Sequence, residues 1–428
     1  MKEHFKEAIE VRLGKKNREI KENIYEIDSE NPFAIHQMID KLVNIQQVYY
    51  LGAIHRTGYE LQDLSLIGKM EEDSIVNFFR LCKALDEQDL FRKNIKLTVV
   101  TNDSVNIVGS ENTTPFGSGI YGFAMSAAVE FPYWNIQCVD VSFEINSQES
   151  ICKKLIELSH YPQNKENEFL ALREQNFYKR VIKDLELKPS TFSSFKNSGV
   201  YFIVGGTGGI GLSLGKYLAK NFKAKLVLTG RSELTGELEE KIKEIEYFGS
   251  EVLYLQADVT SIEDMEYAVE EATIRFGKVD GVIHSALVLK DQSIRSMSED
   301  ILREVMASKI RGSVILYKVF EKKKLDFMLF FSSTCSFLKS AGQSNYSAGC
   351  MFQDMFSAVL HDVAPFPVKT INWSYWSEAG VVANKKYVEK LTSQGILGIK
   401  IEEGIQAIEE VLSSGVKQTI VQKLVKIY

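Results

Sequence analysis

A serine, a tyrosine and a lysine in the second half of the chain have the types and spacing of a proton-transfer site. Ser333 follows a hydrophobic run, Tyr346 comes thirteen residues later, and Lys309 lies 24 residues earlier, where we expect a helix. A ketone that accepts a hydride also needs a proton at its oxygen. A tyrosine can donate that proton if a nearby cation lowers its pKa from about 10. Each residue alone is weak evidence, because serines often end strands and helical lysines usually face solvent.

A glycine-rich turn lies upstream of these residues. Residues 201–211 read Y-F-I-V-G-G-T-G-G-I-G, a buried strand that runs into glycines, and leucines at helical spacing follow. The G-x-G-x-x-G pattern allows a tight turn, a close approach to a pyrophosphate and close packing of helix on strand, and the helix N-terminus attracts phosphates. The alternative is a turn that binds nothing. The predicted cofactor-binding residues here are Gly205, Gly206, Thr207, Gly208, Gly209, Ile210 and Gly211.

The ends of the next two strands indicate which nucleotide is bound. Arg231 and Ser232 follow the second strand, where such folds meet the adenosine ribose. An acidic residue there would bond the 2′-OH, whereas an arginine accepts a 2′-phosphate, so NADP(H) is predicted. A surface arginine is the alternative. Asp258 and Val259 end the third strand, where an adenine-contacting pair would lie, although Asp258 could instead cap the following helix.

Alternating strands and helices must position these residues. In the second half we expect strands at 201–204, 252–256, 279–284, 327–331 and 368–373, and helices at 262–276, 313–320 and 344–360. In the first half we expect strands at 24–27, 48–54, 96–101 and 136–141, and helices at 32–43, 75–85 and 120–129. This alternation predicts an α/β fold with parallel sheets.

The two halves also resemble each other locally. K-L-T-V-V-T matches F-M-L-F-F-S, and Tyr121 matches Tyr346, with an offset of 346 − 121 = 225 residues. We infer two Rossmann-like doubly wound parallel-sheet subdomains, the first truncated and without a nucleotide loop. The alternative is that any two α/β sheets alternate in this way. The predicted parts are a linker or short leading segment at 1–19, the structural subdomain at 20–195 and the catalytic NADPH-binding subdomain at 196–428, joined by a turn-rich seam at 189–197.

Composition excludes several classes of protein. The chain has 428 residues, 45% of them hydrophobic and 25% charged, as expected of a globular protein with two domains. A net charge of −6 argues against nucleic-acid binding. No apolar run is long enough to span a membrane, and the charged start is not a secretory signal. Five cysteines without C-x-x-C and six scattered histidines predict a cytoplasmic protein with reduced thiols and no metal.

The residues together resemble the short-chain dehydrogenase/reductases, and more closely the ketoreductase domains of modular polyketide synthases. Ordinary members of the superfamily have Tyr-x-x-x-Lys, but Cys350 stands four residues after Tyr346. Polyketide ketoreductases place their lysine ahead of the serine, as Lys309 is here. Similar stretches cover nearly the whole chain: H-S-A-L, F-F-S-S, A-G-Q-S-N-Y, I-N-W-S-Y-W-S-E-A-G and, in the first half, G-I-Y-G-F-A-M-S-A-A-V-E-F-P.

The resemblance implies NADPH-dependent reduction of a β-keto group. The acyl substrate would be tethered through phosphopantetheine to an acyl carrier protein, beside neighbouring domains of a multifunctional enzyme for polyketide and antibiotic biosynthesis. Tyr346 would donate the proton, Ser333 would bind the carbonyl oxygen, and Lys309 would lower the tyrosine pKa and support proton relay. The matching positions also assign Ser285 and Ala286 to the cofactor. Cys350 replaces a family asparagine, and because a thiol is a poor donor we expect only an auxiliary role.

Two stretches of the sequence bear on the configuration of the alcohol. Family members that give the D alcohol carry Leu-Asp-Asp after H-x-A, and here Leu289 is followed by Lys290 and Asp291. Members that give the L alcohol carry a tryptophan eight residues before the tyrosine, where this chain has Leu338. The D alcohol (B-type) is therefore predicted. Asp291 could alternatively be a helix N-cap near Ser293.

Two other functions stay open from the sequence. One is a stand-alone reductase of small ketones, although such an enzyme needs only the second half of the chain. The other is a domain that carries out no reduction, kept as a structural spacer or to epimerise a branched substrate, although intact Lys309, Ser333 and Tyr346 argue against a silent site.

Overall fold

The computed structural model describes residues 8–42, 44–55, 58, 60–160, 169–187, 193–380, 385–393 and 395–425. Its contacts divide the chain into two compact units, here called unit 1 and unit 2. Unit 1 consists of Met1–Ile182, Lys290–Glu304 and Phe337–Met355, and unit 2 of Lys183–Leu289, Val305–Ser336 and Phe356–Tyr428. The predicted boundary between residues 195 and 196 follows chain order rather than contacts, so it stays a prediction. Residues 189–192 of the predicted seam lie outside the described residues.

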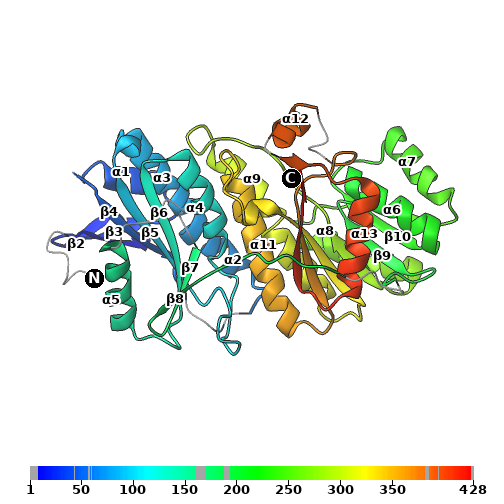
Figure 1. Ribbon diagram of the computed structural model, residues 1–428, viewed down its shortest axis with the longest axis horizontal. Coiled ribbons are helices and arrows are strands. Elements are labelled where there is room, and N and C mark those ends of the chain that lie inside the picture. Colours follow the sequence, from blue (N-terminus) through cyan, green and yellow to red (C-terminus); the bar gives the residue numbers. More distant parts are fainter. Residues whose placement is uncertain are drawn as a thin grey trace. The chain divides into compact units, whose positions relative to one another are not determined.

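Unit 2 is built on a seven-stranded sheet with the order β11-β10-β9-β12-β13-β14-β16. Figure 1 labels β9 and β10 of this sheet, in green. All neighbouring strands in it are parallel. The strand order reverses between β9 and β12, and open α/β sheets bind their ligands at the carboxyl ends of strands at such a switch point. The strands are β9 (Val200–Val204), β10 (Lys225–Gly230), β11 (Val252–Gln256), β12 (Gly281–His284), β13 (Phe327–Ser333), β14 (Val368–Trp373) and β16 (Gln418–Val421).

Helices cover both faces of this sheet. Alternate residues of β9 point to opposite faces: Tyr201 and Ile203 share a core cluster with Ile408 of α13, whereas Phe202 packs against Phe320 of α10 at 5.3 Å between ring centroids. Burial on both faces explains why β9 (V-Y-F-I-V) and the first five residues of β13 (F-M-L-F-F) are continuous apolar runs that could be recognised from sequence. The helices of this unit are α6 (Gly209–Phe222), α7 (Gly236–Glu246), α8 (Ile262–Phe276), α10 (Arg311–Phe320), α12 (Lys385–Ser393) and α13 (Ile401–Ser413), with a 3-10 turn η3 (Thr334–Ser336) and a two-stranded sheet of β15 (Ile396–Leu397) and β17 (Lys423–Leu424).

Unit 1 contains a five-stranded sheet whose order, β4-β5-β6-β7-β8, follows the chain without a reversal. Within this sheet, the β7–β8 pair is antiparallel and the other pairs are parallel. A sheet that advances in one direction corresponds to one half of a doubly wound fold, and it has no switch point. The truncated Rossmann-like arrangement predicted for the first half is therefore confirmed. The strands are β4 (Gln47–Ala53), β5 (Ile95–Asn102), β6 (Trp134–Val141), β7 (Phe169–Arg173) and β8 (Asn176–Lys179).

Buried charged side chains occupy the carboxyl ends of the unit 1 strands. Arg173 pairs with Glu111 and, at 2.7 Å, with Asp140. Thr101 also donates a hydrogen bond of 2.8 Å to Asp140. Burial raises the pKa of Asp140, and the adjacent Arg173 opposes that rise. A Rossmann sheet binds its ligand at the carboxyl ends of its strands. In unit 1 the chain's own polar side chains fill that region.

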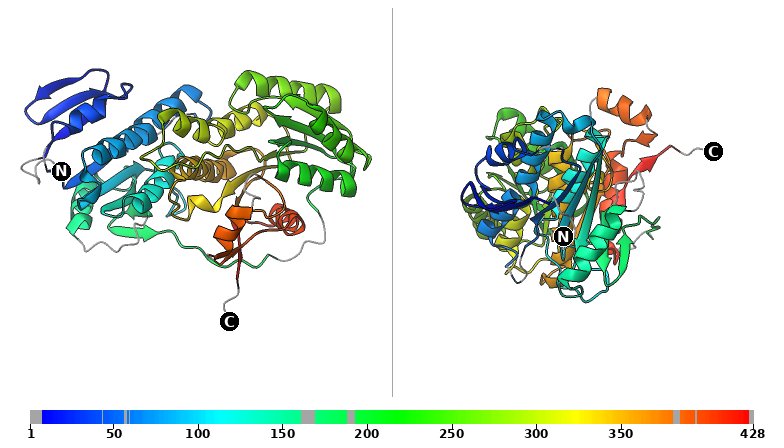
Figure 2. Two further views of the ribbon diagram at one scale, coloured as in Figure 1. Left: turned by 90° about the horizontal axis from the view of Figure 1, so that it is seen from above. Right: turned by 90° about the vertical axis from the view of Figure 1, so that its left-hand side faces the viewer.

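Of the linker or short leading helix that we expect at residues 1–19, residues 1–7 lie outside the described residues, and strands occupy most of the rest. β1 (Glu10–Gly14) pairs in parallel with β3 (Ile24–Asp28), and β2 (Arg18–Lys21) pairs antiparallel to β3. Figure 2 shows this small sheet in dark blue. Every residue of β2 is exposed, so the sequence carries no apolar alternation there that could indicate a strand.

The helices of unit 1 include an irregularity that periodicity did not predict. A π-helical segment, η1 (Glu72–Val76), joins α2 (Leu64–Glu71) to α3 (Asn77–Glu87). Such segments are rare and are often found at functional sites. The predicted helix at 32–43 is shorter, since α1 covers Ala34–Ile39. The other helical elements are η2 (Leu90–Arg92), α4 (Gly119–Glu130), α5 (Gln148–His160), α9 (Glu299–Ala307), which begins in this unit, and α11 (Ser344–Val363), which begins here and ends in unit 2.

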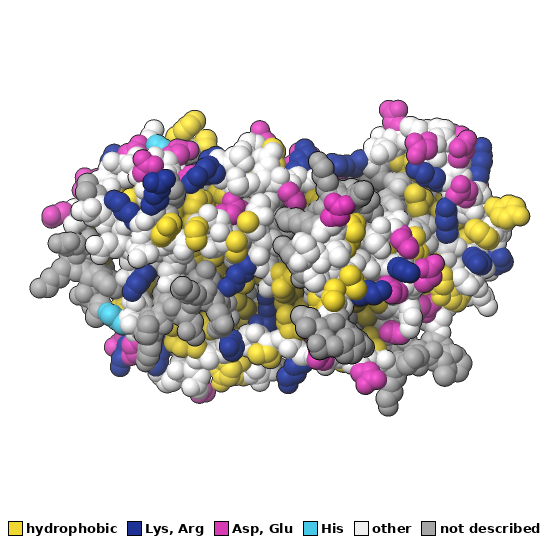
Figure 3. All heavy atoms as spheres, turned by 45° about the horizontal axis from the view of Figure 1, so that its top comes forward, with side chains coloured by type: hydrophobic (Ala, Val, Ile, Leu, Met, Phe, Trp, Pro, Cys, Tyr) yellow, Lys and Arg dark blue, Asp and Glu magenta, His cyan; other side chains and the backbone are white. Residues whose placement is uncertain are grey.

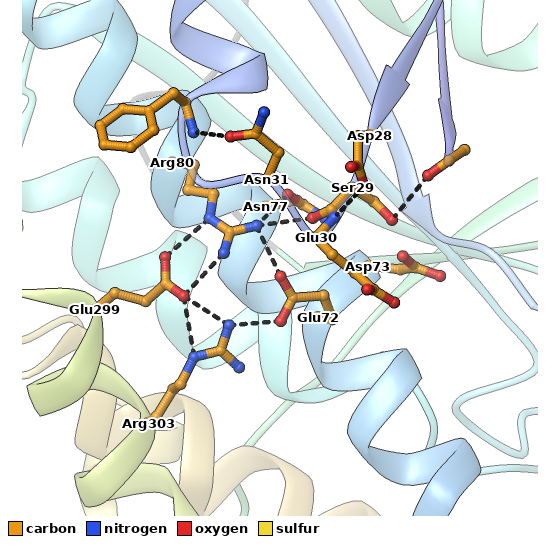
Figure 4. Close-up of polar contacts among 12 residues, drawn as sticks. Asp28, Ser29, Glu30, Asn31, Glu72, Asp73, Asn77, Arg80, Glu299 and Arg303 are labelled. Carbon is orange, nitrogen blue, oxygen red and sulfur yellow. Dashed lines mark hydrogen bonds and ion pairs between the residues drawn. The ribbon is translucent and has the colours of Figure 1, made fainter. Parts of the chain in front are cut away.

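A ring of four charges fixes the segment 290–304 within unit 1 (Figure 4). Arg80 is buried and forms a two-bonded pair with Glu299 at 2.8 Å for both contacts, and a contact of 2.7 Å with Glu72. Arg303 closes the ring by pairing with the same two glutamates. Burial alone would raise the pKa of Glu299, but Arg80 and Arg303 outweigh it and hold that pKa below its ordinary value.

The surface carries mixed charge. On the face drawn in Figure 3, basic and acidic side chains of the described residues are interspersed rather than gathered into one basic area. Among the described residues, no helix is both long enough and apolar enough to cross a membrane.

Candidate active site

The glycine turn of unit 2 forms a narrow cradle between β9 and α6. Gly205 has a φ of +73°, and a Cβ there would lie 2.8 Å from the backbone of Ala286. A Cβ at Gly211 would lie 2.6 Å from the carbonyl oxygen of Gly205, so the helix packs directly on the turn. The left-handed residue is therefore Gly205, one position before the first glycine of the predicted motif. Gly206 closes the turn by donating to the Ile203 carbonyl at 3.2 Å.

The N-terminus of α6 is suited to an anion. Gly208 is its N-cap and offers no side chain to the first amide groups of the helix. Helix N-termini carry unpaired N–H groups and a partial positive charge, which favour phosphate. Because side chains at Gly205 or Gly211 would fill the cradle, the residues present fit a dinucleotide pyrophosphate. Gly209 is equally confined, since a Cβ there would lie 2.4 Å from the Gly380 amide nitrogen.

Arg231 and Ser232 follow β10 beside this turn. A Cβ at Gly230 would lie 2.6 Å from the hydroxyl oxygen of Thr207, which places the end of β10 against the glycine turn. Gln256 donates to the Arg231 carbonyl at 3.1 Å and so fixes the backbone there, while the Arg231 side chain is exposed. An exposed guanidinium held at this position is available to a 2′-phosphate.

Asp258 and Val259 follow β11. The Asp258 carboxylate accepts from the Thr260 amide at 2.9 Å and from the Thr260 hydroxyl at 2.8 Å, which shapes the turn before α8. The N-cap of α8 is Ser261, so the alternative that Asp258 caps that helix is wrong. Val259 is buried.

Ser285 and Ala286 lie against the glycine turn. Ser285 donates to the Val204 carbonyl from its hydroxyl at 2.8 Å and from its amide at 2.9 Å. This leaves Ala286 facing Gly205. Leu289 follows in the same irregular stretch and is partly buried.

Ser333 is the last residue of β13 and is almost fully buried. Its hydroxyl oxygen accepts from the Cys335 amide at 3.2 Å. Asn372 on β14 donates to the Ser333 carbonyl at 3.1 Å and to the Ser336 hydroxyl at 3.0 Å. Asn372 thus holds the strand end in place, a role that sequence reasoning missed, although the residue belongs to the I-N-W-S stretch of the resemblance.

Lys309 is 1% exposed, which rules out the solvated lysine that was the alternative. It lies in the turn between α9 and α10 rather than on the helix that we expect there. Its ammonium group donates to the carbonyl of Phe331, which is on the same strand as Ser333. A buried lysine is rare and needs polar partners. Unit 2 therefore brings Lys309 and the strand that ends in Ser333 together.

The pKa of His284, at the end of β12, is affected by burial and by the buried charge of Lys309. Its Nε2 lies 3.0 Å from the Ser308 carbonyl. Burial, together with repulsion from Lys309, lowers the pKa of His284 to about 3. The imidazole is therefore neutral around pH 7.

This depressed pKa predicts a specific loss of stability in acid. The folded pKa lies below the unfolded value of about 6.5, so the unfolded chain takes up a proton first as the pH falls. Stability from this group is complete above about pH 6.5 and declines at about 1.4 kcal/mol per pH unit toward the folded pKa. Urea unfolding between about pH 7 and pH 5 should show a steeper decline for the wild type than for His284→Phe. If the stability of both proteins declined equally with falling pH, the predicted role of His284 would be contradicted.

Tyr346 and Cys350 are in unit 1, one helical turn apart near the start of α11. Tyr346 is 8% exposed and its amide donates to the side-chain oxygen of Asn345 at 2.8 Å. Cys350 is fully buried. Residues four apart lie on the same helix face, so Cys350 and Tyr346 are on the same face of α11.

Asp291 and Leu338 are also in unit 1. The Asp291 carboxylate accepts from the Gln343 side chain at 2.9 Å, three residues before Tyr346. Asn345 donates to the Lys290 carbonyl at 3.1 Å. Leu338 is 41% exposed. The predicted stereocontrol segment and the start of α11 are therefore in direct contact within this unit.

The structure thus gathers the predicted residues into two groups. Unit 2 holds the glycine turn, the two residues after β10, the turn before α8, and Lys309 with Ser333. Unit 1 holds Tyr346, Cys350, Asp291 and Leu338. The approach of Tyr346 to Ser333 and Lys309 stays a prediction. Within the described residues, no three His, Cys, Asp or Glu side chains form a group that could hold a metal.

Comparison with known proteins places the chain in a family. Residues 199–378 match the family model described as KR domain. The polyketide synthase PksN of Bacillus subtilis (strain 168) is 31% identical over 394 residues, which cover 91% of this chain. The chain belongs to the ketoreductase domains of polyketide synthases. This ketoreductase domain spans only 7% of the length of PksN.

Further comparisons concern the first half and the fold of this ketoreductase domain. Residues 1–158 match the family model described as Beta-ketoacyl synthase-like, N-terminal. An N-terminal ketoreductase from the macrolactin assembly line has a TM-score of 0.80 at 23% identity, covering 97% of this chain and 81% of that one. A multidomain structure with adenylation, ketoreductase and pseudo Asub parts, from a keto acid-selecting NRPS module, has a TM-score of 0.87 at 21% identity. It covers 96% of this chain and 35% of the other. These likenesses confirm the α/β fold with parallel, Rossmann-like sheets.

Proposed function

We propose that this chain reduces the β-keto group of an acyl thioester carried by an acyl carrier protein, with NADPH as the reductant. The product would be a D-configured β-hydroxyacyl thioester, and neighbouring megasynthase domains would supply and consume the carrier. Bound in the cradle of unit 2, NADPH would supply the hydride that goes to the carbonyl carbon. The residues that would hold it are those of the glycine turn, with Arg231 at the 2′-phosphate.

The chain's own residues would bind the carbonyl oxygen of the substrate and protonate it. The Ser333 hydroxyl donates a hydrogen bond to it, and the Tyr346 hydroxyl transfers its proton to it, so that ketone, hydride and proton give the alcohol. The Lys309 ammonium stabilises the tyrosinate that is left. Cys350, in the helical turn after Tyr346, has at most an auxiliary part.

One observation carries this proposal: the buried ammonium of Lys309, bonded to the Phe331 carbonyl beside the end of β13. Burying a cation opposes folding unless it is well partnered, and a structural role alone would be served as well by an apolar side chain. A buried cation beside Ser333 supports acid–base chemistry at that strand end.

The direct test is reduction of a β-ketoacyl-N-acetylcysteamine thioester, followed by loss of NADPH absorbance and chiral analysis of the alcohol. We expect NADPH consumption and a D alcohol in excess, because Asp291 is present and Leu338 replaces the tryptophan of L-specific members. An excess of the L alcohol would refute the stereochemical part, and no consumption would refute the reductase. Faster turnover of small free ketones than of carrier-bound substrate would favour a stand-alone reductase.

Replacing Arg231 tests the choice of NADPH over NADH. Arg231→Leu removes the proposed 2′-phosphate partner, and a charge-assisted hydrogen bond is worth enough to raise the dissociation constant of NADPH about tenfold or more. Binding of NADH, which has no 2′-phosphate, should hardly change. Titration by fluorescence measures both, with Arg275→Leu as the control because Arg275 is an exposed arginine at the end of α8. An equal loss for both nucleotides would contradict the assignment.

A further inference from the structure

Glu130, the last residue of α4, bonds two distant backbone segments at once. One carboxylate oxygen accepts from the Ile294 amide at 2.6 Å, and the other accepts from the Gly342 amide at 3.0 Å. These residues lie 164 and 212 positions away along the chain. Burial raises the pKa of Glu130, and the two amide hydrogen bonds oppose that rise. A half-buried carboxylate with one amide on each oxygen is a two-pronged clamp.

The two clamped segments are those that carry the predicted stereocontrol and proton-donor residues. Ile294 lies three residues after Asp291, and Gly342 lies four residues before Tyr346. The segments also bond to each other, because the Gln292 amide donates to the Gly342 carbonyl at 2.9 Å. With the Gln343–Asp291 and Asn345–Lys290 bonds, they form a closed network within unit 1.

The helix that carries Glu130 is itself fixed against α11. A Cβ at Gly122 of α4 would lie only 2.1 Å from the Ser347 carbonyl oxygen, so the two helices touch through their backbones. The hydroxyls of Ser126 and Ser347 are 3.3 Å apart. α4 therefore has little freedom to shift along α11, and its last residue is held at a set place.

The far side of the Ile294 segment is anchored as well. Lys83 of α3 donates to the carbonyls of Arg295 and Met297 at 3.1 and 3.2 Å. Arg295 pairs with Asp86, and the ring of four charges then holds α9 (Figure 4). The Ile294 amide itself is held by Glu130 of α4.

We propose that Glu130 is a positioning residue, which aligns the Asp291 segment with the start of α11 and thereby sets the configuration of the alcohol. The proposal rests on the proposed reduction of a β-ketoacyl thioester. It assigns a role in selectivity to the half of the chain that has no nucleotide loop. A glutamine at this position could serve only one of the two amides, because its NH₂ group would face an N–H donor.

The variant Glu130→Gln tests this positioning role, and Glu130→Asp keeps the negative charge. The control is Glu149→Gln, because Glu149 is an exposed glutamate of α5. With the β-ketoacyl-N-acetylcysteamine substrate, we expect Glu130→Gln to lower the D-to-L product ratio about tenfold, as loss of one charge-assisted bond allows. The kcat should fall while the dissociation constant of NADPH stays that of the wild type. Glu130→Asp should recover part of the ratio, and Glu149→Gln should match the wild type.

Hydrogen exchange gives a readout that does not depend on activity. Peptides covering residues 290–298 and 337–346 should exchange faster in Glu130→Gln, while peptides of β9 and α6 in unit 2 stay protected. Unchanged protection of both segments overturns the inference, and so does faster exchange with an unchanged product ratio and kcat. If the wild type reduces no β-ketoacyl thioester, the proposed function and the effect on product configuration both fail, and exchange still decides whether Glu130 orders the two segments.

Discussion

Replacing Tyr346 by phenylalanine should lower kcat by about a thousandfold, within the range of general acid catalysis. The ring fills the same buried volume near the start of α11, so the variant should fold as the wild type does. Only the proton donor is lost, and binding of NADPH by the glycine turn of unit 2 should not change. Single-turnover reduction of a β-ketoacyl thioester and NADPH titration measure the two quantities.

Tyr121→Phe is a matched control for this loss. Tyr121 is the counterpart of Tyr346 in the first half, is fully buried, and donates a long hydrogen bond of 3.4 Å to Asp140. Its replacement should cost about 1 kcal/mol of stability and leave kcat intact. Cys350→Asn, at the family's asparagine position, should also remain active. An active Tyr346→Phe together with an inactive Cys350→Asn would reverse the assignment.

Replacing Gly205 by alanine should raise the dissociation constant of NADPH at least about thirtyfold. A left-handed φ of +73° costs an alanine about 1–2 kcal/mol, and its Cβ would also press on the backbone of Ala286 at 2.8 Å. Backbone cannot move aside as a side-chain tip can, so the turn must shift away from the shape that receives a pyrophosphate. Isothermal titration measures the constant, and circular dichroism checks the fold.

Gly215→Ala provides the comparison within the same helix. Gly215 lies in the middle of α6, and a Cβ there would meet only the ends of the Ile245 and Leu226 side chains, at 3.3 and 3.5 Å. Alanine favours helix over glycine by about 1 kcal/mol, so this variant should be as stable as the wild type or more so and should bind NADPH normally. Equal binding by both variants would show that the turn does not receive the nucleotide.

The elements around the cradle could be predicted because they are regular and buried. The predicted limits of α8 and β11 coincide with the structure, because β11 begins with a continuous apolar run (V-L-Y-L) and an amphipathic helix repeats its apolar face. The small sheet at the start of the chain could not be predicted, because β2 has no buried face to leave a pattern. The π-helical segment η1 could not be predicted either, because its five residues are too few to show a distinct hydrophobic periodicity.

The site was predictable in its residue types more than in its contacts. Residue spacing identified Lys309, but not that it is buried in a turn and bonded to Phe331. The motif indicated Gly206 for the tight turn, whereas the left-handed φ belongs to Gly205. Asn372 and Glu130 lie in stretches that carry the resemblance, but their contacts could not be predicted, because each acts through partners distant in the chain, such as Gly342, 212 positions from Glu130.

The ring formed by Arg80, Glu72, Glu299 and Arg303 constrains how such domains can be recombined. Its first two members come from the first half of the chain and the other two from the second half. A hybrid that joins halves of different synthases near residue 195 would inherit two charges from each parent. If the parents differ there, a buried guanidinium loses its carboxylate, at a cost of about 3–5 kcal/mol. Grafts should therefore exchange both halves together, or transplant all four charges as a set.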